Sequence, residues 1–439
     1  MDPYKQRREQ LRRAIGGDVA VIPSARTTLR NNDSAYPFRQ DSDFYYLTGF
    51  NEPDAVLVLA TQHGEHSDVL FLRDRDRDRE IWDGDRLGVE RAARELGVDA
   101  AFPIGKLAER LPDYLIGATT LYYEFGRSDD TDRSVRDALE RTRERARHKG
   151  RVPHAFADPA NVLHPMRLIK SDAELSTMRR AAAITREGFL TAMRATQPGL
   201  YEYEIEAAIE NEYLRLGAQF TAYESIVGSG DRTTTLHYVA NRERLEAGTL
   251  LLVDSGCELD CYASDVTRTW PVDGRFTGEQ RAIYDIVLAA QEAAIACVRP
   301  GVRRNEFHDA AVKVVTEGLL DLGLLTGSLD ENIEEKHYRT YFMHGTGHWL
   351  GLDVHDAGDY RDEDDEPVRL RPGMVTTVEP GIYVRRDLDC AERFKGIGVR
   401  IEDDILVTAE GNENLTQAIP KRVDDLEAIV GSARQPALA

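Results

Sequence analysis

The sequence predicts an α+β protein with two domains. Its 439 residues exceed one ordinary domain, because about 150 residues per domain favours two or three. Short apolar runs that are typical of strands alternate with long amphipathic helices. Prolines interrupt this pattern repeatedly over residues 153–165. We therefore place the boundary within residues 155–175, and expect an N-terminal mixed α/β domain over residues 1–165 and a C-terminal domain over residues 166–439.

The N-terminal domain is expected to hold a sheet of short buried strands. Apolar runs at Asp18–Pro23, Ala55–Ala60 and Val69–Leu72 predict these strands. The run Arg73–Glu80 alternates arginine with acidic residues, which favours a solvated, self-neutralising surface over a catalytic group. Arg133–Lys149 has the charged amphipathic pattern of a helix.

The C-terminal domain is expected to open with a long helix. Ser171 and Glu174 have the spacing of a capping box, and the helical pattern behind them continues to about Ala195. Further helices and strands alternate along the rest of the domain. The helices are expected at Tyr203–Leu216, Thr277–Cys297 and Asn305–Leu322, and the strands at Leu250–Asp254, Asp265–Pro271, Met374–Glu379 and Val399–Val407.

Composition argues against several functional classes. Lys and Arg total 56 against 77 Asp and Glu, and the net charge of −21 disfavours nonspecific binding to nucleic acid or to anionic membranes. No apolar run is long enough to span a membrane, and the N-terminus lacks the apolar core of a signal peptide, so a cytoplasmic protein is expected. Cys257 and Cys261 form C-x3-C without a second pair, which is a weak zinc signal, and buried thiols are the expected state.

Two aspartates mark the first candidate site. Asp254 ends an apolar run, and Asp265 begins the next predicted strand. A hairpin turning at Leu259–Asp260 would place the two directly opposite each other, with Cβ atoms about 5 Å apart. Two carboxylates at that distance repel each other unless a proton or a cation lies between them. The alternative is a turn at another position, with one aspartate on the surface.

A second carboxylate pair and a histidine cluster have the same character. Glu379 and Glu402 each end a β-rich run, and His344, His348 and His355 lie within twelve positions among glycines. The H-E-x-x-H helix of zinc proteases is absent. One histidine with four carboxylates is an oxygen-rich donor set that suits divalent ions such as Mn²⁺. Four carboxylates exceed the need of one ion, whereas two ions about 3.5–4 Å apart would use them all.

Motifs spread over almost the whole chain support one family. Besides the aspartate strands and the histidine block, they are Tyr36–Gln40, Ser42–Pro53, Ile226–Gly230, Val378–Gly381, Arg400–Asp404 and Gly411–Thr416. Together they resemble bacterial Xaa-Pro aminopeptidases, or aminopeptidases P, among the pita-bread metallopeptidases. The resemblance implies a creatinase-like N-terminal domain, used for oligomerisation and the site entrance, and a C-terminal pita-bread catalytic domain.

The resemblance also implies a dinuclear metal site. Its ligands would be Asp254, Asp265, His348, Glu379 and Glu402. Asp265 and Glu402 would bridge the two ions. Asp254 would belong to one ion, and His348 and Glu379 to the other. Because none of the five is substituted, the resemblance disfavours a creatinase-like relative that lacks the full set.

The ions implied by the resemblance are two divalent cations, with Mn²⁺ expected from the donor set. Such ions lower the pKa of a bridging water, so that hydroxide forms near neutral pH and attacks the carbonyl before proline. His355 matches the family residue that stabilises the oxyanion, and His237 and Arg400 match residues that line the site. Glu379 or a histidine would carry the proton to the departing nitrogen, and the sequence does not decide which.

Four further residues are expected to contact the substrate. Tyr223 and Tyr383 could form the apolar wall for a prolyl ring, with ordinary core positions as the alternative. His344 is expected either to line the site or to have a structural role. Trp82 matches a family tryptophan that reaches the active-site entrance of a neighbouring subunit, and the resemblance therefore implies a homo-oligomer, a tetramer as in similar bacterial enzymes. The alternative for Trp82 is packing within its own domain.

The expected substrates are peptides with an N-terminal Xaa-Pro sequence. Prolidase, a dipeptidase with the same ligands, is the nearest alternative. Methionine aminopeptidase shares the ligands but lacks a first domain of this size. A non-enzymatic binding module on the same fold would require loss of the metal ligands, all of which are present.

Overall fold

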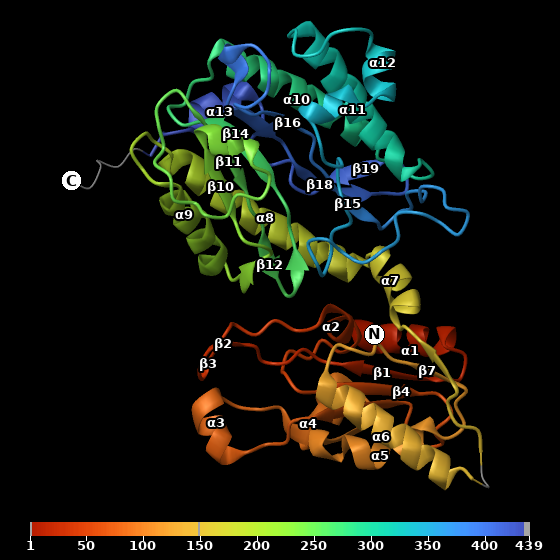
Figure 1. Ribbon diagram of the computed structural model, residues 1–439. Helices are drawn as coiled ribbons and strands as arrows, with labels where there is room; N and C mark the ends of the chain where they lie inside the picture. Colours follow the sequence, from red (N-terminus) through yellow and green to blue (C-terminus); the bar gives the residue numbers. More distant parts are fainter. Residues whose placement is uncertain (1, 148–149, 434–439) are drawn as a thin grey trace. The chain divides into compact units, whose positions relative to one another are not determined.

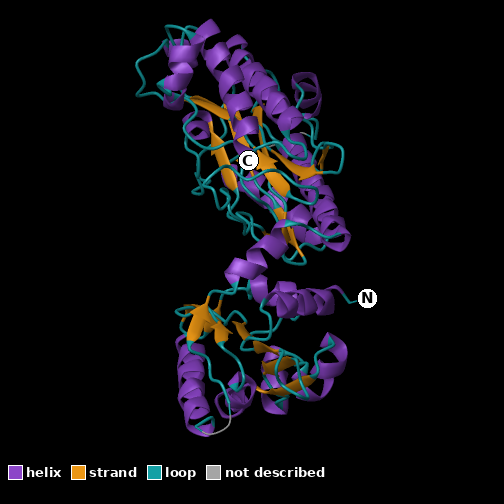
Figure 2. Ribbon diagram, turned by 90° about the vertical axis from the view of Figure 1, so that its right-hand side faces the viewer, coloured by secondary structure: helices purple, strands orange, loops and turns teal. Residues whose placement is uncertain are grey.

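The computed structural model describes residues 2–147 and 150–433 (Figure 1). The chain forms two compact units, Met1–Met166 and Arg167–Ala439. Each unit has its own hydrophobic core, and each combines helices with strands (Figure 2). No helix in the described part of the chain is both long and apolar enough to cross a membrane.

The first unit is built on a six-stranded mixed sheet in the order β6-β5-β4-β1-β7-β8. β1 pairs antiparallel with β4 and parallel with β7. The strands of the sheet are β1 (Val19–Pro23), β4 (Val56–Ala60), β5 (Asp68–Leu72), β6 (Ala100–Pro103), β7 (Thr120–Tyr122) and β8 (Ala155–Ala157), and a separate ribbon pairs β2 (Leu29–Asn31) with β3 (Ser34–Ala35). The helices are α1 (Pro3–Ala14), α2 (Ser42–Thr48), α3 (Arg77–Asp83), α4 (Gly88–Leu96), α5 (Leu107–Leu115), α6 (Asp129–Arg145) and α7 (Ala160–Leu168), which continues into the second unit.

Local sequence explains these elements. Every residue of β1, β4 and β5 is buried, as expected for short apolar strands that are covered on both faces. The alternating charged run at Arg73–Glu80 leads into the exposed helix α3, where Asp76 accepts a hydrogen bond from the main chain at the helix start. Helix α6 begins four residues before the predicted start. The predicted end of that helix at Lys149 lies outside the described residues.

The second unit combines small sheets with long helices. The sheet orders are β10-β11-β14, β13-β12-β9, β15-β18-β19 and β16-β17. The strands are β9 (Phe220–Thr221), β10 (Ile226–Ser229), β11 (Leu250–Asp254), β12 (Cys257–Leu259), β13 (Tyr262–Ala263), β14 (Thr267–Pro271), β15 (Val375–Val378), β16 (Gly381–Val384), β17 (Ile397–Arg400), β18 (Asp403–Val407) and β19 (Asn412–Asn414). The helices are α8 (Asp172–Ala195), α9 (Glu202–Arg215), α10 (Gly278–Cys297), α11 (Arg304–Asp321), α12 (Leu329–Glu334) and α13 (Val423–Ile429).

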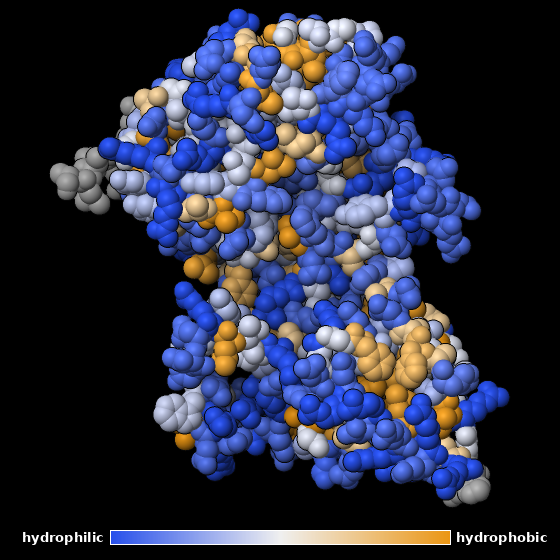
Figure 3. All heavy atoms as spheres, in the orientation of Figure 1, coloured by the Kyte–Doolittle hydropathy of each residue, from blue (hydrophilic) through white to orange (hydrophobic). Residues whose placement is uncertain are grey.

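The long helices cover the strands of this unit from outside (Figures 1 and 2). Helix α8 packs on α9 and on the β12–β13 hairpin, whereas α10 packs on α11 and on β15 to β17. The capping box predicted at Ser171 and Glu174 is present, with the main-chain N–H of Ser171 donating to the Glu174 carboxylate at 2.8 Å. The outer face is mostly hydrophilic (Figure 3), in keeping with the net charge of −21.

The predicted register of the aspartate strands is wrong by two residues. Asp254 pairs with Thr267 rather than with Asp265. The turn lies one residue later than predicted, at Asp260 and Cys261, which both have positive φ angles, 49° and 66°. Two consecutive residues with positive φ are typical of a tight hairpin turn. Because side chains alternate along a strand with a period of two, a shift of two residues leaves both aspartates on the same side.

The predicted strand Val399–Val407 is also wrong, because it is two strands. β17 pairs with β16, and β18 pairs with β15, so the chain changes sheets at Ile401 and Glu402. The β-rich composition of the segment does not reveal such a change of partner. The break places Glu402 between two sheets, where the residue is only 2% exposed.

A buried ion cluster fixes the start of the second unit. The carboxylate of Asp356 accepts hydrogen bonds from Arg167 at 2.6 Å and from Lys170 at 2.9 Å. All three side chains are almost fully buried. Burial alone would raise the pKa of Asp356, but the charges of Lys170 and Arg167 hold it below its ordinary value.

We predict that Asp356→Asn lowers the free energy of unfolding by about 3–5 kcal/mol at neutral pH, because it removes the counter-ion of the buried Lys170 and leaves Arg167 with Asp353 as its ion-pair partner. A carboxyl group whose pKa is lowered by folding stabilises the protein above its unfolded pKa, and this contribution is lost as the pH falls through the folded value. The difference between the variant and the wild type should therefore shrink below about pH 4. Urea unfolding measures it, with the exposed Asp365→Asn as control. Equal midpoints for all three proteins at neutral pH would contradict the assignment.

Candidate active site

A cavity of about 490 Å³ in the second unit brings the predicted site residues together. Separate strand ends supply them: Asp254 ends β11, Asp265 precedes β14, Glu379 follows β15, and Glu402 separates β17 from β18. Residues lining the cavity include Tyr223, His237, Asp254, Asp265, His344, His348, His355, Glu379, Arg400 and Glu402.

Asp254 and Asp265 converge on one tyrosine. The hydroxyl of Tyr223 lies 2.6 Å from Oδ1 of Asp254 and 2.5 Å from Oδ1 of Asp265. A hydroxyl has one proton to donate, so it cannot fully satisfy two carboxylates. Burial and the two neighbouring carboxylates raise the pKa of Tyr223 well above its ordinary value. The aspartates therefore need further positive charge.

His348 faces the same carboxylates. Its Nδ1 lies 3.0 Å from the carbonyl oxygen of Trp349, and its Nε2 lies 3.3 Å from Asp265 and 3.8 Å from Glu379. The contact to the carbonyl orients the ring, so that Nε2 points at the acidic groups. Burial alone would lower the pKa of His348, but Asp265 raises it to about 9.

The two glutamates are held mainly through the backbone beside them. The main-chain N–H of Glu379 donates to the carbonyl of Thr346 at 2.8 Å, which joins this residue to the histidine loop. The main-chain N–H of Glu402 donates to the carbonyl of Thr267 at 3.0 Å, and the Thr267 hydroxyl donates to the Glu402 carboxylate at 2.7 Å. These bonds position both carboxylates from strands that neighbour the aspartates.

Arg400 is the buried cation of the site. It donates to Asp254 at 2.6 Å, to the hydroxyl of Thr267 at 3.0 Å and to the hydroxyl of Tyr383 at 3.0 Å. One guanidinium cannot balance four carboxylates. Burial, followed by the charges of neighbouring acids, raises the pKa of Asp254 and Glu402, and burial raises that of Glu379 to about 7.

The donor set fits divalent cations. Ligand atoms of Asp265, His348 and Glu402 all lie within 4.8 Å of one another, and contacts to Tyr223 and His348 bring Asp254 and Glu379 to the same group. Four carboxylates and one imidazole are the ligands that hard or intermediate divalent ions prefer. Burial first, and then the neighbouring acids, raises the carboxyl pKa values, and a cation between the carboxylates would offset both effects.

Three more histidines line the cavity. The ring of His355 contacts that of His348 edge to face, with centroids 4.3 Å apart. Nε2 of His344 lies 2.8 Å from the hydroxyl of Tyr383, and its Nδ1 lies 3.9 Å from Glu379. Burial and the charge of Arg400 lower the pKa of His344 to about 3. His237 is exposed at the cavity wall.

Two of the predicted substrate residues lie elsewhere. Tyr383 is fully buried and is not among the residues that line the cavity, so its contacts with His344 and Arg400 make it a support for them. Trp82 belongs to the first unit, where it is 84% exposed. Sequence reasoning missed the residues of the apolar wall and one further acid, because nothing in the sequence assigns them a role, although Ile226 and Val354 lie within motifs of the family resemblance. The missed residues are Glu224, Ile226, Leu236, Val239 and Val354.

Comparison with known proteins agrees with this architecture. Residues 176–409 match the model of metallopeptidase family M24, and residues 4–122 match that of the aminopeptidase P N-terminal domain. The Xaa-Pro aminopeptidase of Escherichia coli is 44% identical over 434 residues, which cover 98% of each chain. The Xaa-Pro aminopeptidase of Haemophilus influenzae is 46% identical over 401 residues, covering 91% of this chain and 90% of its own.

Solved structures agree as well. The Pseudomonas aeruginosa aminopeptidase PepP has a TM-score of 0.95 and 45% identity, with 98% of both chains covered. Zinc-substituted Escherichia coli aminopeptidase P in complex with product has a TM-score of 0.95 and 44% identity, with 99% of both chains covered. The two-domain fold class and the family resemblance expected from the sequence are thus confirmed. The chain belongs to metallopeptidase family M24, with an N-terminal domain of the aminopeptidase P type.

Proposed function

We propose that this protein is a metallo-aminopeptidase that releases the N-terminal residue from peptides with proline in the second position. The observation that carries the proposal is the cavity in which four carboxylates and a histidine with metal-ligand chemistry meet three more histidines. Relatives named Xaa-Pro aminopeptidase match over nearly the whole chain, which favours this activity over that of a prolidase.

We propose a dinuclear site held by all five candidate ligands, with Mn²⁺ as the ion. The oxygen-rich donor set supports manganese. When bound, the ions supply Lewis acidity and a water whose pKa is lowered towards neutrality. The ligands are Asp254, Asp265, His348, Glu379 and Glu402, with Asp265 and Glu402 as the bridges.

The other cavity residues would bind and orient the peptide. His355 and His237 offer ring N–H groups to the carbonyl before proline. Glu379 or a histidine is placed to move a proton to the departing nitrogen. The nitrogen of the Xaa–Pro peptide bond belongs to the proline ring and carries no hydrogen, so the prolyl ring must be recognised by shape. Ile226, Leu236, Val239 and Val354 supply an apolar wall for it.

The peptide amine needs an acidic partner close to the reacting carbonyl. Glu224 lines the cavity and is not one of the proposed metal ligands. Two divalent ions would balance the four ligand carboxylates, which leaves the charge of Glu224 for a cationic group of the substrate. This arrangement supports cleavage at a free N-terminus.

We predict that Glu402→Ala binds less metal and loses at least about 100-fold in kcat/KM while remaining folded, because one bridging carboxylate is removed. Metal analysis and hydrolysis of an Xaa-Pro-Yaa tripeptide measure the two effects. The exposed Glu410→Ala is the matched control and should behave as the wild type. A folded Glu402→Ala protein with full activity and two bound ions would refute the proposed ligand.

We also propose that the protein is a cytoplasmic homotetramer. Ile81 and Trp82, both on α3, are 79% and 84% exposed, which is unusual for large apolar side chains and supports contact with another subunit. The family resemblance supports a role for Trp82 at the site entrance of a neighbouring subunit.

Sedimentation at micromolar concentration is expected to give a mass of about four chains, in keeping with closed symmetry. Trp82→Ala should weaken assembly or raise KM, whereas Tyr36→Ala, which removes another exposed aromatic side chain, provides the control. A fully active wild-type monomer would rule out the tetramer as the functional form.

Substrate length distinguishes an aminopeptidase P from a prolidase. A prolidase must recognise the free carboxylate of a dipeptide, whereas an aminopeptidase P leaves that end open. We expect a higher kcat/KM for an Xaa-Pro-Yaa tripeptide than for the matching Xaa-Pro dipeptide, and hardly any turnover of the N-acetylated tripeptide. Steady-state kinetics on the three peptides test this expectation. A strong preference for the dipeptide would make the protein a prolidase.

A further inference from the structure

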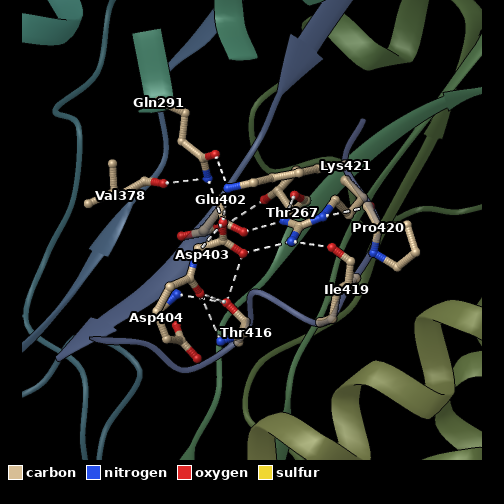
Figure 4. A network of polar contacts seen from close by, with 12 residues as sticks. Thr267, Gln291, Val378, Glu402, Asp403, Asp404, Thr416, Ile419, Pro420 and Lys421 are labelled. Carbon is tan, nitrogen blue, oxygen red and sulfur yellow. Dashed lines mark hydrogen bonds and ion pairs between the residues drawn. The ribbon is translucent and has the colours of Figure 1, made fainter. Parts of the chain in front are cut away.

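A buried polar cluster lies beside the proposed metal ligand Glu402 (Figure 4) and contacts Val378, the residue before Glu379. We call Arg268, Gln291, Asp403 and Lys421 the Asp403 cluster. The carboxylate of Asp403 is fully buried and accepts hydrogen bonds from Arg268 at 2.7 Å, Lys421 at 2.6 Å and Gln291 at 3.1 Å. Lys421 also donates to the side-chain oxygen of Gln291 at 2.7 Å. A buried network with this many satisfied partners is rigid.

The Asp403 cluster reaches the main chain beside both glutamates. Arg268 donates to the carbonyl oxygens of Thr267, at 3.0 Å, and of Glu402. Gln291 donates to the carbonyl oxygen of Val378, directly before Glu379, at 3.4 Å. Asp403 itself follows Glu402 in the chain. The cluster therefore contacts the backbone on which both glutamate ligands are carried.

Asp254 is supported by different groups. Arg400 and Tyr223 donate to its two carboxylate oxygens at 2.6 Å each. The two sets of contacts meet at Thr267, whose hydroxyl accepts from Arg400 and donates to Glu402. Glu402 is one of the proposed ligands, so this meeting point lies beside the group of residues that would hold the ions.

We propose that the Asp403 cluster is a positioning unit for Glu379 and Glu402, and that it supports the ion held with His348 more than the ion held by Asp254. The inference rests on the proposed dinuclear site. Residues that orient metal ligands affect metal affinity although they do not touch the ion. Lys421 and Gln291 are the members that are adjacent in the chain neither to a proposed ligand nor to Thr267, which bonds to one.

The charge of Lys421 makes the direction of the effect diagnostic. Removing a cation near a metal site would strengthen cation binding if charge alone mattered. Loss of positioning has the opposite effect. Weaker binding of one ion by Lys421→Met would therefore report on the position of the ligands rather than on the electrostatic potential at the site.

The test is a calorimetric titration of Mn²⁺ into the metal-stripped full-length protein. The wild type should bind two ions. Lys421→Met and Gln291→Leu should each lower the affinity for one of the two ions about tenfold, with a smaller effect on the affinity for the other. Lys421→Arg keeps the charge and the donors and should restore the affinity, and the exposed Lys313→Met should match the wild type.

Circular dichroism and thermal unfolding establish that each variant is folded, and Gln291→Leu carries the test if Lys421→Met does not fold. Wild-type affinities for both ions in a folded variant would overturn the inference. Tighter binding, or an equal loss of affinity for the two ions, would overturn it as well. A wild type that binds fewer than two ions would instead refute the dinuclear site of the proposed function.

Discussion

Four carboxylates crowded into one cavity, three of them buried and that of Glu379 partly buried, are the constraint on which the rest of this structure depends. Arg400 donates a hydrogen bond to Asp254, whereas His348 lies beside Asp265 and Glu379. The mutual repulsion of the carboxylates and their removal from water both raise the cost of charging them. A protein retains such an arrangement only where a cation or a proton balances it, and the fold around the cavity has the features needed to hold one.

The fold meets this constraint by bringing strand ends together from several small sheets. Each carboxylate lies at the end of a strand or between two strands, where a side chain leaves the apolar core. Hydrogen bonds then fix the backbone: Thr267 joins Glu402 to the aspartate strands, and Thr346 joins Glu379 to the histidine loop. The long helices α8 and α10 cover these strands and keep the strand ends in place. The chemistry of the cavity thus depends on contacts between segments far apart in sequence.

Much of the fold could be predicted, because it follows from local patterns. The capping box at Ser171 sets the start of α8, and the apolar run of Leu250–Asp254 is found as β11. The hairpin register was mispredicted because it depends on which two residues adopt positive φ in the turn. The change of sheets at Glu402 was missed because both flanking segments are equally β-rich. Partner choice is a property of the whole domain rather than of the segment.

The candidate site could be predicted to a different degree for each kind of residue. Carboxylates after apolar runs and histidines among glycines are unusual, so they are visible in the sequence. Val239 and Val354 are not, since an apolar residue in a cavity wall looks like any core residue. Tyr383 shows the converse: it was expected in the wall, and its aromatic ring is fully buried behind His344. Burial of one aromatic residue is decided by tertiary packing, which no single motif encodes.

The central claim is that the crowded carboxylates hold two divalent ions that the reaction requires. The most direct test measures the metal content per chain and the rate of tripeptide hydrolysis in the same samples, as the metal-stripped protein is reloaded with Mn²⁺. The account predicts no hydrolysis without metal and a rate that rises until about two ions are bound per chain. Full activity in protein that contains no metal would contradict it.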